Sequence, residues 1–194
     1  MRVWDRVVEH AAEKHGYVTT QDARELGIDP TQLRLMAARG RLERAGRGVY
    51  RVPVLPRGDH DELAAAVAWS RGRGVVSYES ALVLHGLADV NPPRIHLTVP
   101  LDNHPRAAGG ELYRTHRHEL AASDVTQVDA LPATTVARTI RDCMAAGTDP
   151  YQLRLAIDRA EAAGTLRRRI AGELRAELDA AGVGATARSR RRSE

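Results

Sequence analysis

Apolar residues recur at helical spacing in three short segments near the N-terminus, residues 3–14, 21–26 and 30–39. A glycine follows each segment and is expected to end the helix. The third helix has the clearest start, because Asp29 can cap it and Pro30 fits its first turn. Two alternating stretches then flank a glycine-rich turn, at residues 41–44 and 49–52. Helix, turn, helix and hairpin in this order predict a winged helix-turn-helix.

The remainder of the chain mixes helical and strand-like patterns after a linker at residues 53–60 that is rich in proline and glycine. Helices are expected at residues 61–70, 77–85, 132–144, 149–162 and 165–180. Strands are expected at residues 94–99, 111–116 and 124–129. The helix after the last strand is expected to begin at Pro132, and the final helix to end before Gly182.

These elements predict an α+β protein with three parts. We expect a winged helix-turn-helix DNA-binding domain at residues 1–57 and a second α+β domain, with a small sheet packed by helices, at residues 58–184. Residues 185–194 (ATARSRRRSE) offer nothing to bury and are expected to form a disordered basic tail. The tail is either an arm that grips DNA or idle solvated charge.

The composition and the lack of long apolar segments indicate the cellular compartment of the protein. The single cysteine, Cys143, excludes an intramolecular disulfide, which is typical of a reducing interior. The start of the chain lacks the apolar segment of a signal peptide, and no apolar run approaches the roughly 20 residues that span a bilayer. We therefore expect a cytoplasmic protein without a membrane partner.

Charge is concentrated on the predicted winged module. Residues 31–57 contain seven arginines and one acidic residue, Glu43, for a net charge of +6. Basic charge on a motif shaped to enter a groove favours binding to DNA phosphate. Residues 58–164, by contrast, carry a net charge of −4, from 10 basic and 14 acidic residues.

The expected DNA contacts lie on the third helix, at the start of the second and along the wing. Leu33 and Met36 face the core, and Leu35 is expected there rather than at a thymine methyl group. Gln32 and Arg34 are suited to base edges, whereas wing arginines are better suited to phosphate. The complete set is Thr20, Thr31, Gln32, Arg34, Arg39, Arg41, Arg44, Arg47 and Arg51.

The segment HGYVTTQDARELGIDPTQLRLMAARGRLERAGRGVYRV resembles the N-terminal winged domain of the AbiEi antitoxin family. The resemblance continues through VVSYESALVLHGL, PRIHLTVP, ELYRTHRHEL and LPATTVARTIRDC, and so covers residues 5–165 in order. It implies a type IV antitoxin that counteracts a nucleotidyltransferase toxin of the AbiEii kind. It further implies repression through inverted repeats in the protein's own promoter, with DNA contacts on the outward face of the third helix and around Arg47.

Longer relatives of the family end in a restriction-type nuclease domain, which needs paired carboxylates and a lysine. The only lysine here, Lys14, lies in the first predicted helix, and this argues against nuclease activity. His116 and His118 share a strand face, but a metal site needs more ligands. We expect no catalytic residue, no metal and no cofactor. A stand-alone winged-helix regulator without a toxin, or an enzyme of the nuclease or phosphotransfer type, remain the alternatives.

One winged module reads few base pairs, so useful specificity needs two copies on an inverted repeat. Whether the copies associate in solution or meet only on DNA is left open by the sequence.

Overall fold

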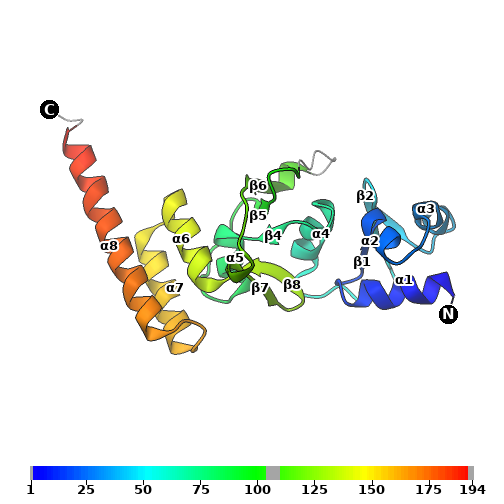
Figure 1. The fold of residues 1–194 in the computed structure, drawn as a ribbon, viewed down its shortest axis with the longest axis horizontal. Helices are drawn as coiled ribbons and strands as arrows, with labels where there is room; N and C mark the ends of the chain where they lie inside the picture. The colour runs from blue at the N-terminus through cyan, green and yellow to red at the C-terminus, as the bar shows by residue number, and fades with distance from the viewer. Residues whose placement is uncertain (1, 104–109, 192–194) are drawn as a thin grey trace. The chain divides into compact units, whose positions relative to one another are not determined.

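The computed structural model describes residues 2–103 and 110–191, with side chains described as far as residue 181. The chain forms two compact units. One contains the residues up to Val76 together with Pro93–Ala133, and the other contains Ser77–Pro92 together with the residues from Thr134 onward. Helices and strands occur in both halves of the sequence, which confirms the α+β class (Figure 1). The predicted domain boundary at residue 57 stays a prediction.

The first unit begins with a winged helix-turn-helix. Its helices and strands are α1 (Val3–Ala12), β1 (Tyr17–Thr19), α2 (Thr20–Glu25), α3 (Pro30–Ala38), β2 (Glu43–Gly46) and β3 (Val49–Arg51). The sheet has three antiparallel strands in the order β1-β3-β2, where the sequence predicted a two-stranded hairpin. Strand β1 was missed because its three residues are all buried and show no alternation.

Local capping explains where the two helices of the motif begin. The Asp29 carboxylate accepts a hydrogen bond from the Thr31 amide at 2.8 Å, and Pro30 occupies the first turn of α3, as predicted. Thr19 caps α2 by accepting from the Asp22 amide at 3.1 Å, and Asp22 accepts from the Thr19 amide at 2.7 Å. Leu33 and Met36 are buried in one core cluster with residues of α1, α2 and β3, which leaves the opposite face of α3 outward.

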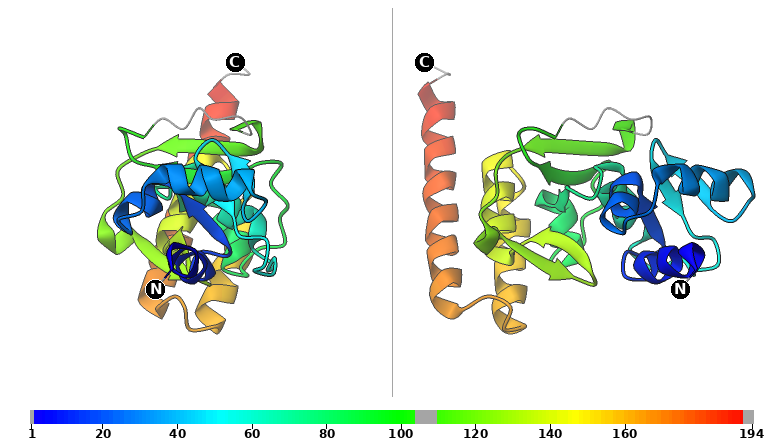
Figure 2. Two further views of the ribbon diagram at one scale, coloured as in Figure 1. Left: turned by 90° about the vertical axis from the view of Figure 1, so that its right-hand side faces the viewer. Right: turned by 45° about the vertical axis from the view of Figure 1, so that its right-hand side comes forward.

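A five-stranded sheet completes the first unit. Its strands are β4 (Val75–Val76), β5 (Ile95–Val99), β6 (Tyr113–Arg117), β7 (Val125–Val128) and β8 (Leu131–Thr134), in the order β6-β5-β4-β8-β7 (Figure 2). Strand β4 pairs antiparallel to β5 and parallel to β8, and β5 pairs parallel to β6. Helix α4 (Asp61–Trp69) precedes the sheet, and short 3₁₀ turns cover Gly110–Leu112 and Ala122–Asp124.

The helix predicted to open at Pro132 begins later. Pro132 lies inside β8, and the helix starts at Val136 with Thr135 at its N-cap. Leu131 and Ala133 are buried, and Ala133 pairs with Val76 of β4. This tertiary pairing outweighs the local helix-start signal of the proline.

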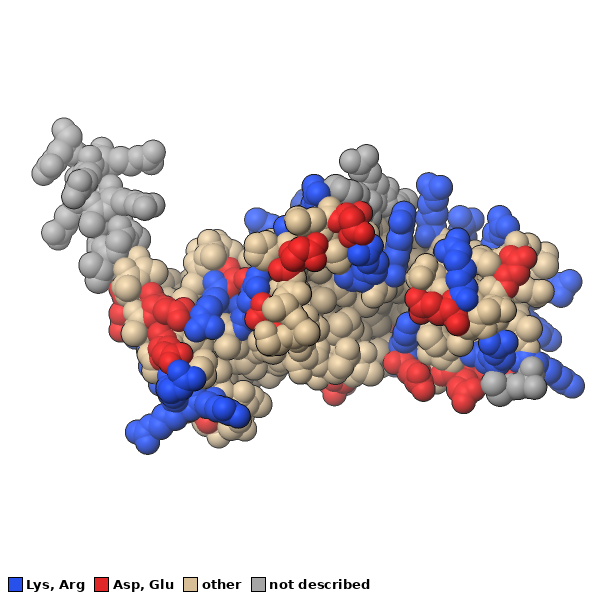
Figure 3. Space-filling view, viewed as in Figure 1, with Lys and Arg blue, Asp and Glu red and all other residues tan. Residues whose placement is uncertain are grey.

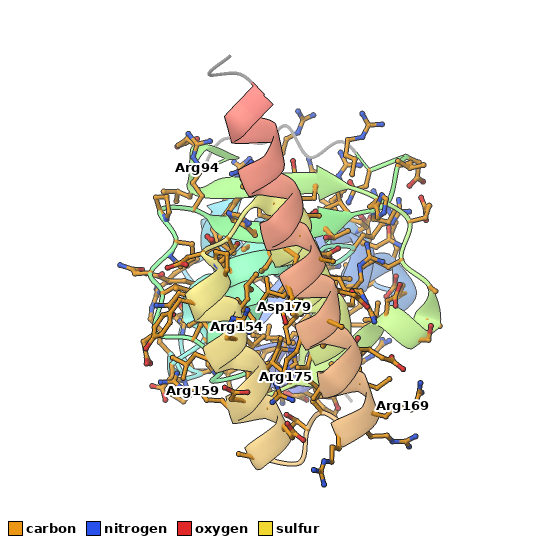
Figure 4. The ribbon with its side chains drawn as sticks, turned by 90° about the vertical axis from the view of Figure 1, so that its left-hand side faces the viewer. Arg94, Arg154, Arg159, Arg169, Arg175 and Asp179 are labelled. Atoms are coloured by element: carbon orange, nitrogen blue, oxygen red, sulfur yellow. The ribbon has the colours of Figure 1, made fainter. Side chains whose placement is uncertain are left out.

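The second unit is helical, with α5 (Tyr78–Leu84), α6 (Val136–Ala146), α7 (Pro150–Ala162) and α8 (Arg168–Arg191). Its core contains Leu82, Ile140, Leu153, Ile157 and Leu174. Helices α7 and α8 lie side by side and carry surface ion pairs across the helix contact (Figure 4). Arg154 pairs with Asp179, and Arg175 lies 2.6 Å from both Asp158 and Glu161.

The end of the chain differs from the sequence expectation. The backbone of α8 continues to Arg191, past the glycines that were expected to stop it and into the predicted tail. Alanine and arginine are strong helix formers, and they outweigh isolated glycines here. The side chains of residues 182–191, and residues 192–194 altogether, lie outside the described part of the chain, so the role of the basic tail stays a prediction. Over the part that is described, no helix is both long and apolar enough to cross a membrane.

Candidate nucleic-acid interface

The predicted base-reading residues lie together at the start of α3. Gln32 and Arg34 are exposed and Thr31 is half-buried. Arg34 donates a hydrogen bond from Nη2 to Thr31 Oγ1 at 3.0 Å. This contact holds the guanidinium beside the first turn of α3. Helix α3 is the second helix of the helix-turn-helix, and the first residues of that helix are the ones that meet base edges in such motifs. Leu35 is 45% exposed, which corrects its assignment to the core and leaves an apolar side chain on the same face.

The wing holds its arginines out from a tight, irregular hairpin. The register of β2 against β3 shifts between Arg44 and Gly46, so the strand is bulged next to the tip. Gly48 adopts φ +75°, a left-handed conformation that glycine accepts without strain. Its carbonyl accepts a hydrogen bond from the Thr20 amide at 2.9 Å, which ties the wing to the start of α2. Arg44 and Arg47 are both exposed on this hairpin. Lysine and arginine side chains are numerous on the surface of the N-terminal module (Figure 3).

Two of the predicted contacts lie at the far end of α3. Arg39 is its C-cap residue and is exposed. Arg41 is also exposed, and its guanidinium carbon lies 5.6 Å from the centre of the Trp4 ring, within the range of a cation–π contact. Neither residue lines the cleft formed by α2, α3 and the wing.

Arg51 was predicted to contact DNA, but the structure buries it. The residue is only 4% exposed, and its Nη2 donates to the Leu55 carbonyl at 2.8 Å. Its Nε lies 3.6 Å from the Asp61 carboxylate at the start of α4. Burial and the same carboxylate raise the pKa of Tyr17 to about 12. Arg51 therefore links β3 to α4 and is not available to a duplex; alternation along the strand was wrong here because all three β3 residues are buried.

One cleft brings four of the predicted residues together. Its volume is about 820 Å³, and α2, α3, the wing and the end of α4 contribute to its walls. Thr20, Arg34, Arg44 and Arg47 line it, together with Arg24 and Arg71, which were not predicted. Among the described residues that line the cleft, five are arginines and none is acidic. Such a lining favours an anionic, phosphate-rich partner.

The two additional arginines differ in how the sequence could have indicated them. Arg24 lies one helical turn after Thr20, which was already assigned to DNA, so helical spacing places both on one face. Arg71 lies beyond the predicted linker, and no local pattern indicates that the end of α4 reaches the wing. Only the tertiary fold brings Arg71 to this cleft.

Cys143 is buried and His116 is half-buried, whereas His118 is on the surface. His116 pairs with His96 of the neighbouring strand, with 3.4 Å between Nε2 and Nδ1, while His118 is exposed. Burial, His96 and Arg114 lower the pKa of His116 to about 4. Within residues 2–103 and 110–181, no three His, Cys, Asp or Glu side chains gather as a metal site. Cys143 is buried, and burial raises the pKa of its thiol to about 12, so the thiol is not a nucleophile near neutral pH.

The order of the elements is that of a winged helix-turn-helix, and the cleft beside its wing is lined by arginines. Residues 5–53 match the AbiEi_4 family, described as a transcriptional regulator and AbiEi antitoxin. This match confirms the resemblance over the N-terminal segment.

One solved structure is similar over most of the chain, at low sequence identity. The chain is similar to that in the crystal structure of the RV2827C protein from Mycobacterium tuberculosis, with 18% sequence identity and a TM-score of 0.38. The similar regions cover 91% of this chain and 82% of that one. No curated protein matches the sequence.

Proposed function

We propose that this protein is a DNA-binding antitoxin of a type IV toxin–antitoxin pair, which represses its own operon and counteracts a nucleotidyltransferase toxin. The observation that carries the DNA-binding part is the exposed, arginine-lined cleft between α2, α3 and the wing. The family description of residues 5–53 supports both the regulatory and the antitoxin parts. The toxin partner rests on the resemblance alone.

In this proposal α3 enters the major groove with its first turn. Gln32 and Arg34 are then placed to read adenine and guanine edges, while Arg44 and Arg47 contact phosphates beside the groove. Thr20, at the start of α2, adds a contact to the sugar–phosphate backbone of the DNA. A single module covers too few base pairs, so two copies occupy an inverted repeat with half-sites one or more helical turns apart.

The test is a gel-shift series on the upstream region of the operon, using Arg34→Ala and Arg47→Ala. Arg34→Ala should cost about 1–3 kcal/mol and reduce the preference for the repeat over a scrambled duplex. Arg47→Ala should weaken binding to both duplexes alike. Arg168→Ala, which removes one exposed charge from the second unit, is the control. If both test variants bind like the control, this face of the module is not the interface.

The antitoxin part has a separate test. The neighbouring gene is expressed alone and together with this chain, and growth is followed. Rescue of growth by the full chain, but not by a variant that lacks the residues from 134 onward, would assign antitoxin activity to the part of the chain beyond the winged module. A neighbouring gene without toxicity would instead support the stand-alone regulator.

A further inference from the structure

The arginine-lined cleft extends beyond the winged helix-turn-helix. Its lining includes Trp69, the last residue of α4, and Arg71, two residues further on, in addition to residues of α2, α3 and the wing. Arg24 on α2 also lines the cleft, as do Arg34, Arg44 and Arg47. The proposed function accounts for the last three of these arginines but gives no role to Arg24 or Arg71.

Neither of these two guanidinium groups has a partner among the residues that the structure describes. Within the described part of the chain, the side chains of Arg24 and Arg71 form no hydrogen bond or ion pair, and both residues are exposed. Arg73 gives the contrast, because its two terminal nitrogens donate to the Asp102 carboxylate at 2.8 and 3.1 Å. The charge of Arg73 is thus compensated inside the protein, whereas those of Arg24 and Arg71 are not.

The backbone at Arg71 gives an independent observation. Arg71 adopts φ +64° and is followed by Gly72 at φ +71°, so two left-handed residues end α4. The Arg71 amide donates to the Ala68 carbonyl at 2.9 Å and the Gly72 amide to the Val67 carbonyl at 3.0 Å, which closes the helix end. Glycine is the residue that fits a left-handed helix end, and arginine is strained there. A positive charge is favourable anywhere in the last turn, so the helix dipole alone does not require it at this strained position.

We propose that Arg24 and Arg71 contact phosphates of the bound duplex, so that the DNA footprint of each copy continues past the wing to the end of α4. This inference rests on the proposed function and deepens it. Five arginines around one cleft without an acidic lining residue repel one another, and a phosphate backbone relieves that repulsion.

The experiment measures binding of the full-length protein by fluorescence anisotropy, on the upstream repeat and on a scrambled duplex, between 50 and 200 mM salt. The test variants are Arg71→Gly and Arg24→Ala. Arg71→Gly removes the guanidinium while it relieves the left-handed backbone, so thermal stability should stay equal or rise. Arg73→Ala is the matched control, since it removes the same charge two residues away. Arg47→Ala reports on the proposed function itself.

We expect each test variant to bind both duplexes more weakly and to flatten the plot of log affinity against log salt by about 0.9. Over this fourfold range of salt, each variant then loses about 3.5-fold less affinity than the parent. The inference would be overturned if Arg71→Gly and Arg24→Ala kept the affinity and the salt dependence of the parent while Arg47→Ala bound more weakly. The proposed interface would then remain intact. An effect of Arg73→Ala as large as that of Arg71→Gly would also overturn it, because general charge would then explain both. No binding by the parent protein would contradict the proposed function.

Discussion

Replacing Gly48 with alanine should distort the wing at its junction with α2. Gly48 has φ +75°, and a Cβ atom there would lie 2.9 Å from Thr20 Oγ1 and 3.4 Å from Thr20 Cγ2. The left-handed backbone costs about 1–2 kcal/mol for a residue with a side chain. Displacing Thr20 adds about 1 kcal/mol or more, as in other cases of overpacking. Gly48→Ala should therefore lower the free energy of unfolding by about 2–4 kcal/mol.

The assay is urea unfolding at neutral pH, with Gly46→Ala as the matched control. A Cβ atom at Gly46 meets only Val49 carbon atoms at 3.8 and 4.0 Å, which is ordinary contact, and no positive φ is required. Gly46→Ala should cost less than about 0.5 kcal/mol on this basis. In a Thr20→Ala background the close contact disappears, so Gly48→Ala should then cost only the backbone share of about 1–2 kcal/mol. The geometry given for the wing would be refuted if Gly48→Ala and Gly46→Ala lowered the free energy of unfolding equally. It would also be refuted if Gly48→Ala cost as much in the Thr20→Ala background as in the parent.

Two further predictions concern buried charges. Burial raises the pKa of Asp22, but hydrogen bonds from Lys14 and Thr19 outweigh this effect and hold the pKa below the ordinary 3.8. The ionised carboxylate therefore stabilises the fold above pH 3.8, and this stabilisation is lost as the pH falls through the lowered pKa. Asp22→Asn should thus reduce stability at neutral pH and flatten its decline below about pH 4, measured by urea unfolding across pH; a decline as steep as in the parent would contradict this. Arg51→Ala should cost about 2–4 kcal/mol by leaving Asp61 short of a buried partner, without changing the salt dependence of DNA binding by the folded fraction; a flatter salt dependence would restore Arg51 to the interface.

Local chemistry in the sequence was enough to predict the helix-turn-helix. The cap at Asp29 and the proline after it set the start of α3, and the spacing of Leu33 and Met36 set its buried face. Because one face of a short helix is fixed by its core residues, the exposure of Gln32 and Arg34 followed directly.

The sequence predictions were wrong where contacts between distant segments determine the local structure. Pairing of β8 with β4 placed Pro132 in a strand, and the approach of α4 to the winged module buried Arg51. The same approach brings Arg71 to the cleft, which no spacing along the chain could indicate. Charge alone therefore indicated a candidate interface, but it did not separate an arginine that faces solvent from one that holds two segments together.

The most direct measurement is a footprint of the full-length protein on the upstream region of its own operon, taken at low and at moderate salt. The cleft and the outward face of α3 predict protection of two half-sites of an inverted repeat, with affinity that falls steeply as salt rises. Protection without an inverted repeat, or binding that does not respond to salt, would contradict the claim that these arginines hold a DNA duplex.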